Sequence, residues 1–212
     1  MNKTTLLALT LMATLSLTNV ASAAGDLGRT IFEKGNAKGA PACSGCHGMD
    51  GNGNAASGIP KLAGLHGDYI FKQLNDFRAG SRTSVMQSIV NGLSDEDVIA
   101  LSQHISSLPL VGYKGGQVSD LVKQGEAIAT HGLWDKDIPA CARCHGEAGG
   151  GIGPFFPALA GQHASYIEAQ ISAWKKGHRH NDPNDLMKGI AQRLTDEEAK
   201  AVAAYYAQFN NH

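Results

Sequence analysis

The sequence Cys43-Ser44-Gly45-Cys46-His47 recurs later in the chain as Cys141-Ala142-Arg143-Cys144-His145. Two cysteines separated by two residues and followed at once by histidine are the signature for covalent attachment of a c-type haem. Each thiol can form a thioether to one vinyl group, and the adjacent histidine is then placed to bind the iron. The two motifs use all four cysteines of the chain. The sequence therefore predicts two covalent haem c groups, attached at Cys43, Cys46, Cys141 and Cys144, with His47 and His145 as axial iron ligands.

The two motifs belong to a longer internal repeat. The segments Pro60–Arg82 and Pro157–Arg179 are identical at 10 of 23 positions, and Leu93–Glu96 aligns with Leu194–Glu197. A repeated unit of this length has the size of a small domain. We therefore expect two tandem domains, at residues 24–108 and 118–212, joined by a linker at 109–117 that contains proline and glycines.

Each unit has the pattern of helices, and no stretch alternates as a half-buried strand would. The expected helices cover 27–36, a segment from about 66 and a segment after 94, then 120–131, a segment from about 163 and a segment after 195. Ser94 and Thr195 are N-cap residues before acidic first turns, and Thr195 with Glu198 forms a capping box. The glycine-rich stretches 48–58 and 146–153 are expected to be irregular loops. The predicted fold class is all-α, with each domain wrapped around one haem.

The first 23 residues have the pattern of a secretory signal peptide. Lys3 precedes an apolar run from Leu6 to Leu17, and Ala21-Ser22-Ala23 follows as a small-residue cleavage site. We expect these residues to be removed on export to the periplasm. The formal net charge of the chain is −1, which does not favour nucleic-acid binding. No later segment is long and apolar enough to cross a membrane, although peripheral association with a membrane stays open.

The sixth ligand of each iron can be approached by elimination. Beyond residue 23 the chain has three methionines, and Met49 lies two residues after His47, on the same side of the haem plane. Met86 lies 39 residues after His47, and Met187 lies 42 residues after His145. Methionine as sixth ligand raises the potential and suits electron transfer. We therefore expect Met86 and Met187 to be the second axial ligands. Two buried core methionines are the alternative.

Two repeated histidines are rival ligands. His66 and His163 each follow a Leu-Ala-Gly turn with one residue between and precede a helix. A histidine there would flank the haem more readily than it would cap the iron. Their other expected role is hydrogen bonding at the start of the helix.

Two prolines complete a pattern that resembles class I cytochromes c. A ligating histidine usually donates its other ring nitrogen to a carbonyl or carboxylate, and Pro60 and Pro157 lie 13 and 12 residues after the two motif histidines. In class I cytochromes c a proline carbonyl at this spacing accepts that bond, and the following leucine packs on the haem. Two such units in tandem after a signal peptide resemble the dihaem cytochrome c4 family. The resemblance implies a periplasmic electron carrier whose domains bring their haem propionate edges together, often delivering electrons to a terminal oxidase.

The two units also differ. The second has about four extra residues around 180–183, and Phe32 and His104 of the first unit correspond to Ala129 and Tyr205. We therefore expect two haem environments that differ in detail, with different potentials.

Several basic residues allow two interpretations. The repeated arginines Arg82 and Arg179 could neutralise haem propionates. The basic cluster of the second unit could dock an acidic redox partner or be a solvated helix end; it contains Lys175, Lys176, His178, Arg179 and His180.

The predicted function is electron transfer between redox protein partners through two His/Met-ligated haems, without enzymatic activity. Two alternatives remain: an electron-accepting subunit of a periplasmic dehydrogenase, or a dihaem peroxidase, which would need one haem to shed its methionine.

Overall fold

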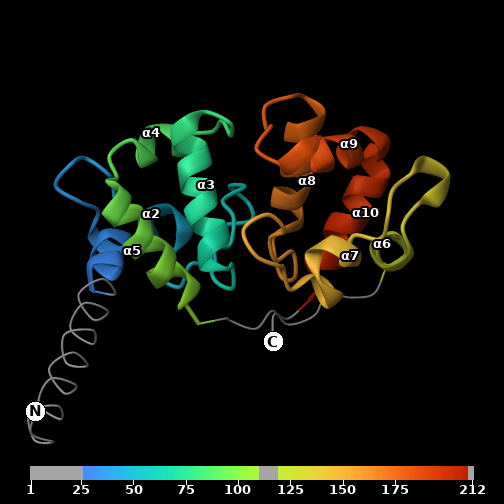
Figure 1. Ribbon diagram of the computed structural model, residues 1–212. Helices are drawn as coiled ribbons and strands as arrows, with labels where there is room; N and C mark the ends of the chain where they lie inside the picture. The colour runs from blue at the N-terminus through green and yellow to red at the C-terminus, as the bar shows by residue number, and fades with distance from the viewer. Residues whose placement is uncertain (1–25, 110–118, 210–212) are drawn as a thin grey trace, which may run out of the picture.

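The computed structural model describes residues 26–109 and 119–209. They form two helical domains that lie side by side, the first drawn from blue to green and the second from yellow to red (Figure 1). Within these residues there are isolated β-bridges and no strand. The all-α prediction with two tandem haem domains is confirmed. The predicted signal peptide lies outside the described residues, as does all of the predicted linker except Pro109, so the domain limits stay predictions.

The first domain begins with helical residues 26–34, which end before Gly35 at φ 78°. Its further helices are α2 (Ser44–His47), α3 (Gly67–Ala79), α4 (Met86–Val90) and α5 (Asp95–Ser106). The second domain repeats this order with α6 (Asp120–His131), α7 (Ala142–His145), α8 (Ala164–Lys175), α9 (Leu186–Arg193) and α10 (Asp196–Tyr206). Short 3₁₀ turns lie between them at Trp134–Lys136, Glu147–Gly149 and Pro183–Asp185.

In each domain a glycine lets the first helix approach the last. A Cβ added to Gly28 would lie 2.1 Å from the carbonyl oxygen of Ala100, and one added to Gly125 would lie 2.0 Å from that of Ala201. No side chain fits at either place. The contact fixes α6 against α10, and residues 26–34 against α5, as the base of each domain.

The N-terminal caps of the last helix in each domain agree with the caps predicted from the sequence. Thr195 and Glu198 form the predicted capping box of α10, and Ser94 with Asp97 forms a second one at α5. Four helices were not expected: the short α2 and α7, and α4 and α9, which carry Met86 and Met187.

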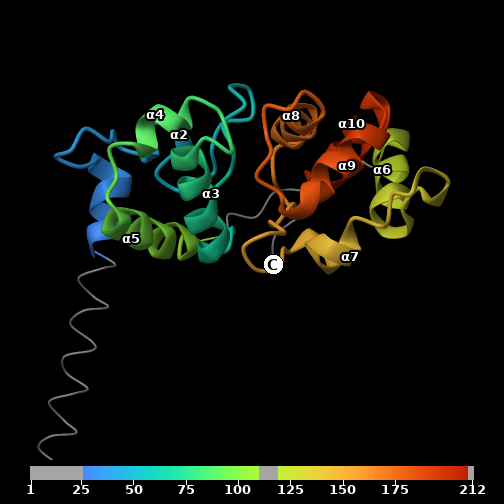
Figure 2. The ribbon, with the colours of Figure 1, turned by 45° about the horizontal axis from the view of Figure 1, so that its top comes forward.

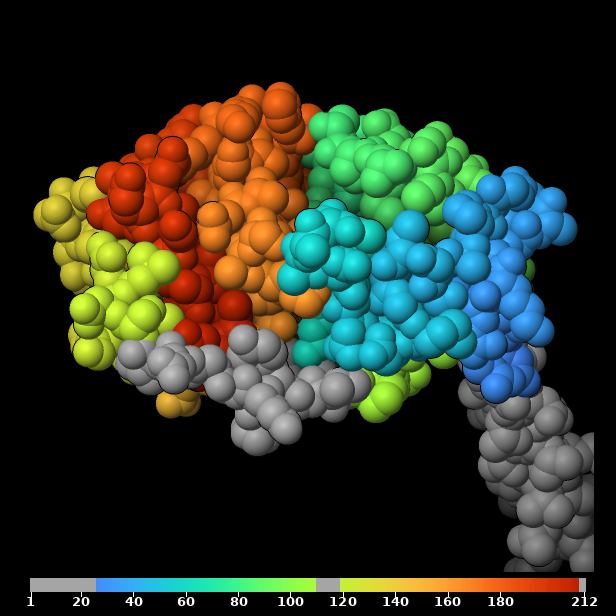
Figure 3. Space-filling model, turned by 180° about the vertical axis from the view of Figure 1, so that it is seen from behind, coloured from blue at the N-terminus to red at the C-terminus, as the bar shows by residue number. Residues whose placement is uncertain are grey.

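The domains meet along α3 and α8, which occupy the inner side of each domain in both ribbon views (Figures 1 and 2). From behind, the surfaces of the two domains abut without a gap (Figure 3). The backbones of Arg82 and Arg179 form an antiparallel bridge across this boundary. Because these residues occupy the same position in the repeat, the contact has an approximate two-fold symmetry.

Candidate haem-binding sites

The four motif cysteines are free thiols in the structure. Cys43 and Cys141 directly precede the short helices α2 and α7, which contain Cys46 and Cys144. Burial raises the pKa of the Cys43 and Cys141 thiols to about 11. A neutral thiol is a poor nucleophile for disulfide exchange, so Cys43 and Cys141 fit covalent attachment of a haem better than redox chemistry of their own.

The two motif histidines are held in one orientation. His47 and His145 are each 6% exposed, and their Nδ1 atoms lie 3.0 and 2.9 Å from the carbonyl oxygens of Pro60 and Pro157. Because a carbonyl oxygen only accepts, Nδ1 carries the proton and Nε2 keeps its lone pair for a metal. Burial lowers the pKa of both imidazoles, which favours the neutral, ligating form.

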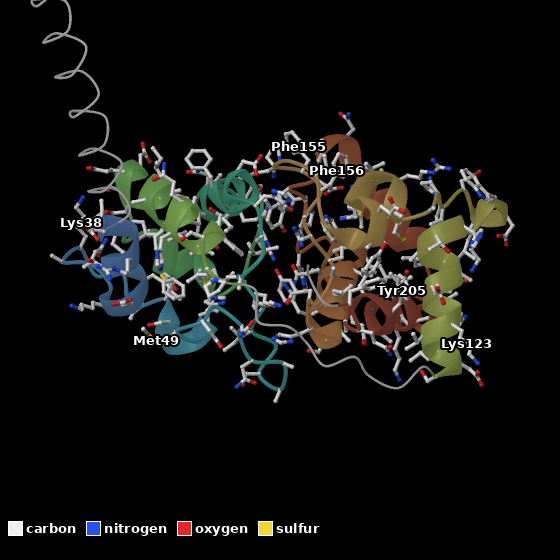
Figure 4. The ribbon with its side chains drawn as sticks, turned by 90° about the horizontal axis from the view of Figure 1, so that it is seen from below. Lys38, Met49, Lys123, Phe155, Phe156 and Tyr205 are labelled. Atoms are coloured by element: carbon white, nitrogen blue, oxygen red, sulfur yellow. The ribbon has the colours of Figure 1, made fainter. Side chains whose placement is uncertain are left out.

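In the second domain Met187 and His145 line one cavity, which is partly open to solvent. Phe155 and Trp174 also line it, and Phe155 and Phe156 project at the boundary between the domains (Figure 4). Tyr69, Lys72 and Gln73 of the first domain close one side of the cavity. The site of the second domain is therefore completed by side chains of the first.

The inserted residues hold Met187 in place. Asp182 accepts a hydrogen bond from Trp174 Nε1 at 2.8 Å and from the Lys188 backbone N–H at 3.0 Å. Asn181 reaches across to the first domain and donates to Gln73 Oε1 at 2.9 Å and to Asp76 Oδ2 at 2.7 Å. The extra residues thus anchor α9 and join the domains.

Met86 occupies the matching place in the first domain. It is the first residue of α4 and packs, half-buried, against the core of that domain. Met49 is 63% exposed and lies at the outer edge of the domain (Figure 4). Ligation by Met86 and Met187 stays a prediction.

The rival histidines connect the domains. His66 and His163 occupy the N-cap positions of α3 and α8, but neither side chain caps its helix. The hydrogen bonding at the helix start that was expected from the sequence is therefore not formed by these side chains. His66 Nε2 lies 3.3 Å from the Gly150 carbonyl oxygen, and His163 Nε2 lies 2.8 Å from that of Asn52. Each histidine therefore contacts the glycine-rich loop of the opposite domain.

Two buried arginines cross at the centre of the interface. Arg82 donates to Tyr166 Oη and to Gln170 Oε1, whereas Arg179 donates to Gln170 Oε1 and, at 3.3 Å, to Tyr69 Oη. Each guanidinium also stacks on an aromatic ring, Arg82 on Phe77 and Arg179 on Trp174.

These arginines carry charge that few groups offset. Within the described residues, neither arginine forms an ion pair with a carboxylate. Asp76 acts on Arg82 from a distance, but its carboxylate forms its ion pair with Lys72. Burial and the neighbouring Arg82 both lower the pKa of Arg179. An arginine stays protonated in proteins, so the interface holds two positive charges suited to an anionic group such as a haem propionate.

The predicted basic cluster is divided in the structure. Arg179 is 5% exposed and faces the interface, whereas Lys175 is paired with Asp196 at 2.6 Å. Arg179 therefore takes no part in a surface patch, whereas Lys176, His178 and His180 are exposed.

Two interface features had no signal in the sequence. Gln162 is buried, accepts from the Lys61 backbone N–H at 3.0 Å and donates to the Lys61 carbonyl oxygen at 2.9 Å. It aligns with Leu65 in the repeat, so the repeat gave no reason to single it out. Lys72, at the cavity of the second domain, aligns with Ala169 and was equally unmarked.

The residues present fit a covalent haem in each domain. The donor set of a c-type haem consists of free thiols, an imidazole with its Nε2 available and, in the second domain, a methionine on the same cavity.

Among the described residues no helix is long and apolar enough to span a membrane.

Comparison with known proteins agrees with this donor set. The Cytochrome c family model matches residues 26–109 and 123–209. The chain is 45% identical over 183 residues to a thiosulfate dehydrogenase electron acceptor from Stutzerimonas stutzeri, covering 85% of each chain. It is 38% identical over 208 residues to cytochrome c4 from Pseudomonas aeruginosa, covering 97% of this chain and 98% of the relative. Among solved structures, thiosulfate dehydrogenase (TsdBA) from Marichromatium purpuratum matches with a TM-score of 0.82 and 42% identity. That match covers 88% of this chain and 40% of the other.

Proposed function

This chain belongs to the dihaem cytochrome c4 family of electron-transfer proteins, and on that premise we propose that it accepts electrons in the periplasm from a dehydrogenase that oxidises thiosulfate. One observation carries the proposal. The identity to the electron acceptor from Stutzerimonas stutzeri is 45%, whereas the identity to cytochrome c4 from Pseudomonas aeruginosa is 38%. The structural similarity to a thiosulfate dehydrogenase chain of which this chain spans 40% supports the same partner.

In this proposal each haem iron supplies a one-electron couple, and the protein supplies the environment. Cys43, Cys46, Cys141 and Cys144 would hold the two groups. The Pro60 and Pro157 carbonyls keep the imidazoles of His47 and His145 oriented, and Met86 and Met187 would supply the second ligand of each iron. The buried guanidiniums of Arg82 and Arg179 would offset propionate charge at the interface.

The packing of the domains serves electron exchange between the two centres. Side chains of the first domain complete the cavity of the second, so the site of the second domain lies at the interface. Two one-electron centres in one chain would let the protein take up two electrons from one donor encounter.

The test is reduction of the oxidised dihaem protein by thiosulfate and a purified thiosulfate dehydrogenase. The α-band absorbance of the reduced haems should rise at a rate that depends on the dehydrogenase concentration. A cytochrome c4 with a known oxidase partner is the control acceptor and should be reduced more slowly. Equal rates for the two acceptors would contradict the proposal.

A second candidate is delivery of electrons to a terminal oxidase. Similarity to cytochrome c4 over 97% of this chain favours it. Oxidation of the reduced protein by oxidase-containing membranes, faster than its reduction by the dehydrogenase system, would identify this role.

The absence of enzymatic activity is also a proposal. If both irons are six-coordinate, hydrogen peroxide should be turned over no faster by this protein than by a mitochondrial cytochrome c.

A further inference from the structure

The segment that leads to Met187 is longer than its counterpart in the first domain. Arg82 and Met86 are separated by residues 83–85, whereas Arg179 and Met187 are separated by residues 180–186. A longer segment has more conformations to lose when it is ordered. It also enters α9 through two successive residues at positive φ, a conformation that is unfavourable for residues other than glycine. Contacts elsewhere must therefore fix the position of Met187.

Asp182 supplies such contacts within the second domain. One carboxylate oxygen accepts a hydrogen bond from Trp174 Nε1 at 2.8 Å, and the other accepts one from the Lys188 backbone N–H at 3.0 Å. Lys188 lies in the first turn of α9, where the N-cap residue forms no side-chain cap. Trp174 belongs to α8 and lines the same cavity as Met187. One carboxylate therefore joins the start of the methionine-bearing helix to the wall of the cavity.

The first domain holds the residue before Asp182. Asn181 Nδ2 donates to Gln73 Oε1 at 2.9 Å and to Asp76 Oδ2 at 2.7 Å. The Asn181 carbonyl oxygen accepts a hydrogen bond from Lys72 Nζ at 2.7 Å. All three partners lie on α3 of the first domain. Separation of the domains would therefore release both the side chain and the carbonyl of Asn181.

The methionine of the first domain is held by a local contact. The Met86 backbone N–H donates to Ser84 Oγ at 3.1 Å, two residues earlier in the chain. This contact lies within the first domain and does not depend on the second.

We propose that Asp182 is a positioning residue that keeps Met187 on the iron of the second haem, and that the first domain keeps Asp182 in place through Asn181. The proposal rests on Met187 as an iron ligand, which is part of the proposed function, and not on the identity of the electron donor. The second haem is then closed to other ligands only while the domains are packed together.

The experiment titrates the oxidised protein, with both haems attached, with imidazole. The ring nitrogen of imidazole can replace the methionine sulfur on the iron without a change of oxidation state, and the sulfur-to-iron absorption band reports the exchange. Asp182→Asn keeps the size of the side chain but turns one acceptor oxygen into a donor amide. Because a hydrogen bond to a charged group is worth about a factor of ten in an equilibrium constant, half of the band should be lost at an imidazole concentration about tenfold lower than in the parent protein. An unshifted titration would overturn the proposal.

Asp185→Asn is the matched control. It removes the same charge two residues before Met187, where the carboxylate pairs with Lys188 Nζ at 3.0 Å and accepts no backbone N–H of α9. The imidazole titration should stay that of the parent protein. An equal shift in Asp185→Asn would mean that charge alone acts on the haem, and would overturn the positioning role.

Asp76→Ala tests the contribution of the first domain. It removes one acceptor of Asn181 from the other side of the interface. The same half of the band should be lost at a lower imidazole concentration than in the parent protein, with a smaller shift than in Asp182→Asn, because Asn181 keeps its bonds to Gln73 and Lys72. A titration identical to that of the parent protein would overturn the part assigned to the first domain.

Met187→Ala separates positioning of the methionine from a general loosening of the domain. In this variant imidazole should bind the second haem without competition from sulfur, so adding Asp182→Asn should change nothing further. A further gain in imidazole affinity would overturn the positioning role. A full band in Met187→Ala would overturn the proposal at the ligand assignment itself. None of these titrations involves a dehydrogenase, so their outcome is separate from that of the proposed electron donor.

Discussion

Met187 lies on the same cavity as His145, and this placement leads to a direct test of iron ligation. In Met187→Ala the absorption band that arises from sulfur-to-iron charge transfer should fall to about half, because one of the two haems loses its sulfur ligand. The potential of that haem should fall as well. Absorption spectroscopy of the oxidised protein in the near infrared, with a redox titration, measures both effects.

The control for this change is Met49→Ala. Met49 is 63% exposed and lies two residues after His47, so its removal should leave the band intact. Met86→Ala should remove the other half of the band. If the full band survives in the Met86→Ala, Met187→Ala double variant, neither methionine supplies the sulfur ligand and the assignment is wrong.

The charge of Arg179 gives a second prediction. A positive charge near a haem stabilises the reduced iron, so Arg179→Gln should lower the potential of the haem in the second domain. Unit charges roughly 15 Å apart at an effective dielectric constant of about 20 interact by about 1 kcal/mol. For a one-electron couple this is on the order of 50 mV.

Lys175→Gln is the matched control for Arg179→Gln. It removes a positive charge from the same segment, but that charge is already paired with Asp196 at 2.6 Å. Midpoint potentials should therefore change little. Equal shifts in the two variants would mean that Arg179 acts through net charge and not through its place at the interface.

The last helix of each domain, α5 or α10, begins with a capping box whose carboxyl group has a pKa below its ordinary value. Burial raises the pKa of Asp97, but hydrogen bonds from Ser94 and Asn36 outweigh it and hold the pKa below its ordinary value. As the pH falls below about 4, the unfolded chain binds the proton first, so stability that is present above this range is lost. Asp97→Asn should flatten the dependence of unfolding free energy on pH below about 4 and cost about 1 kcal/mol at neutral pH.

Thermal unfolding between neutral pH and about pH 3 measures this effect. Glu96→Gln, at an exposed position in the same first turn, should keep the slope of the parent protein. A slope in Asp97→Asn as steep as in the parent would show that Asp97 carries none of the acid sensitivity.

The capping residues also show which elements a sequence can predict. Ser94, Thr195 and the acidic residues after them predict α5 and α10, because a cap is a local interaction between neighbours in the chain. α4 and α9 were missed because they span only five and eight residues. α9 also follows Asn184 and Asp185 at positive φ, and no side-chain cap marks its start. Its position depends on Asp182 binding Trp174, a contact made only after folding.

The repeat alone could not predict how the two domains pack together, for a similar reason. The repeat predicts two copies of one fold, but it contains no information on which faces meet. Position 66 and position 163 repeat because each histidine contacts the other domain's loop, and the same repetition is equally consistent with haem ligation. Gln162 has no counterpart to mark it. The sequence therefore does not distinguish residues that contact the other domain from residues that act within their own domain.

Gln162 provides the test of how strongly the domains depend on each other. Its amide pairs with both backbone groups of Lys61, at 3.0 and 2.9 Å, in a buried position. Gln162→Ala leaves a buried N–H and a buried carbonyl unpaired, which should cost about 1–3 kcal/mol of contact between the domains. Differential scanning calorimetry should then resolve two transitions, because each domain keeps its own haem and core but no longer unfolds with its neighbour. Gln103→Ala, on the exposed face of α5, should leave a single transition unchanged. If Gln162→Ala also unfolds in that one unshifted transition, this glutamine contributes nothing to the coupling, and the arginine crossing at positions 82 and 179 must carry it.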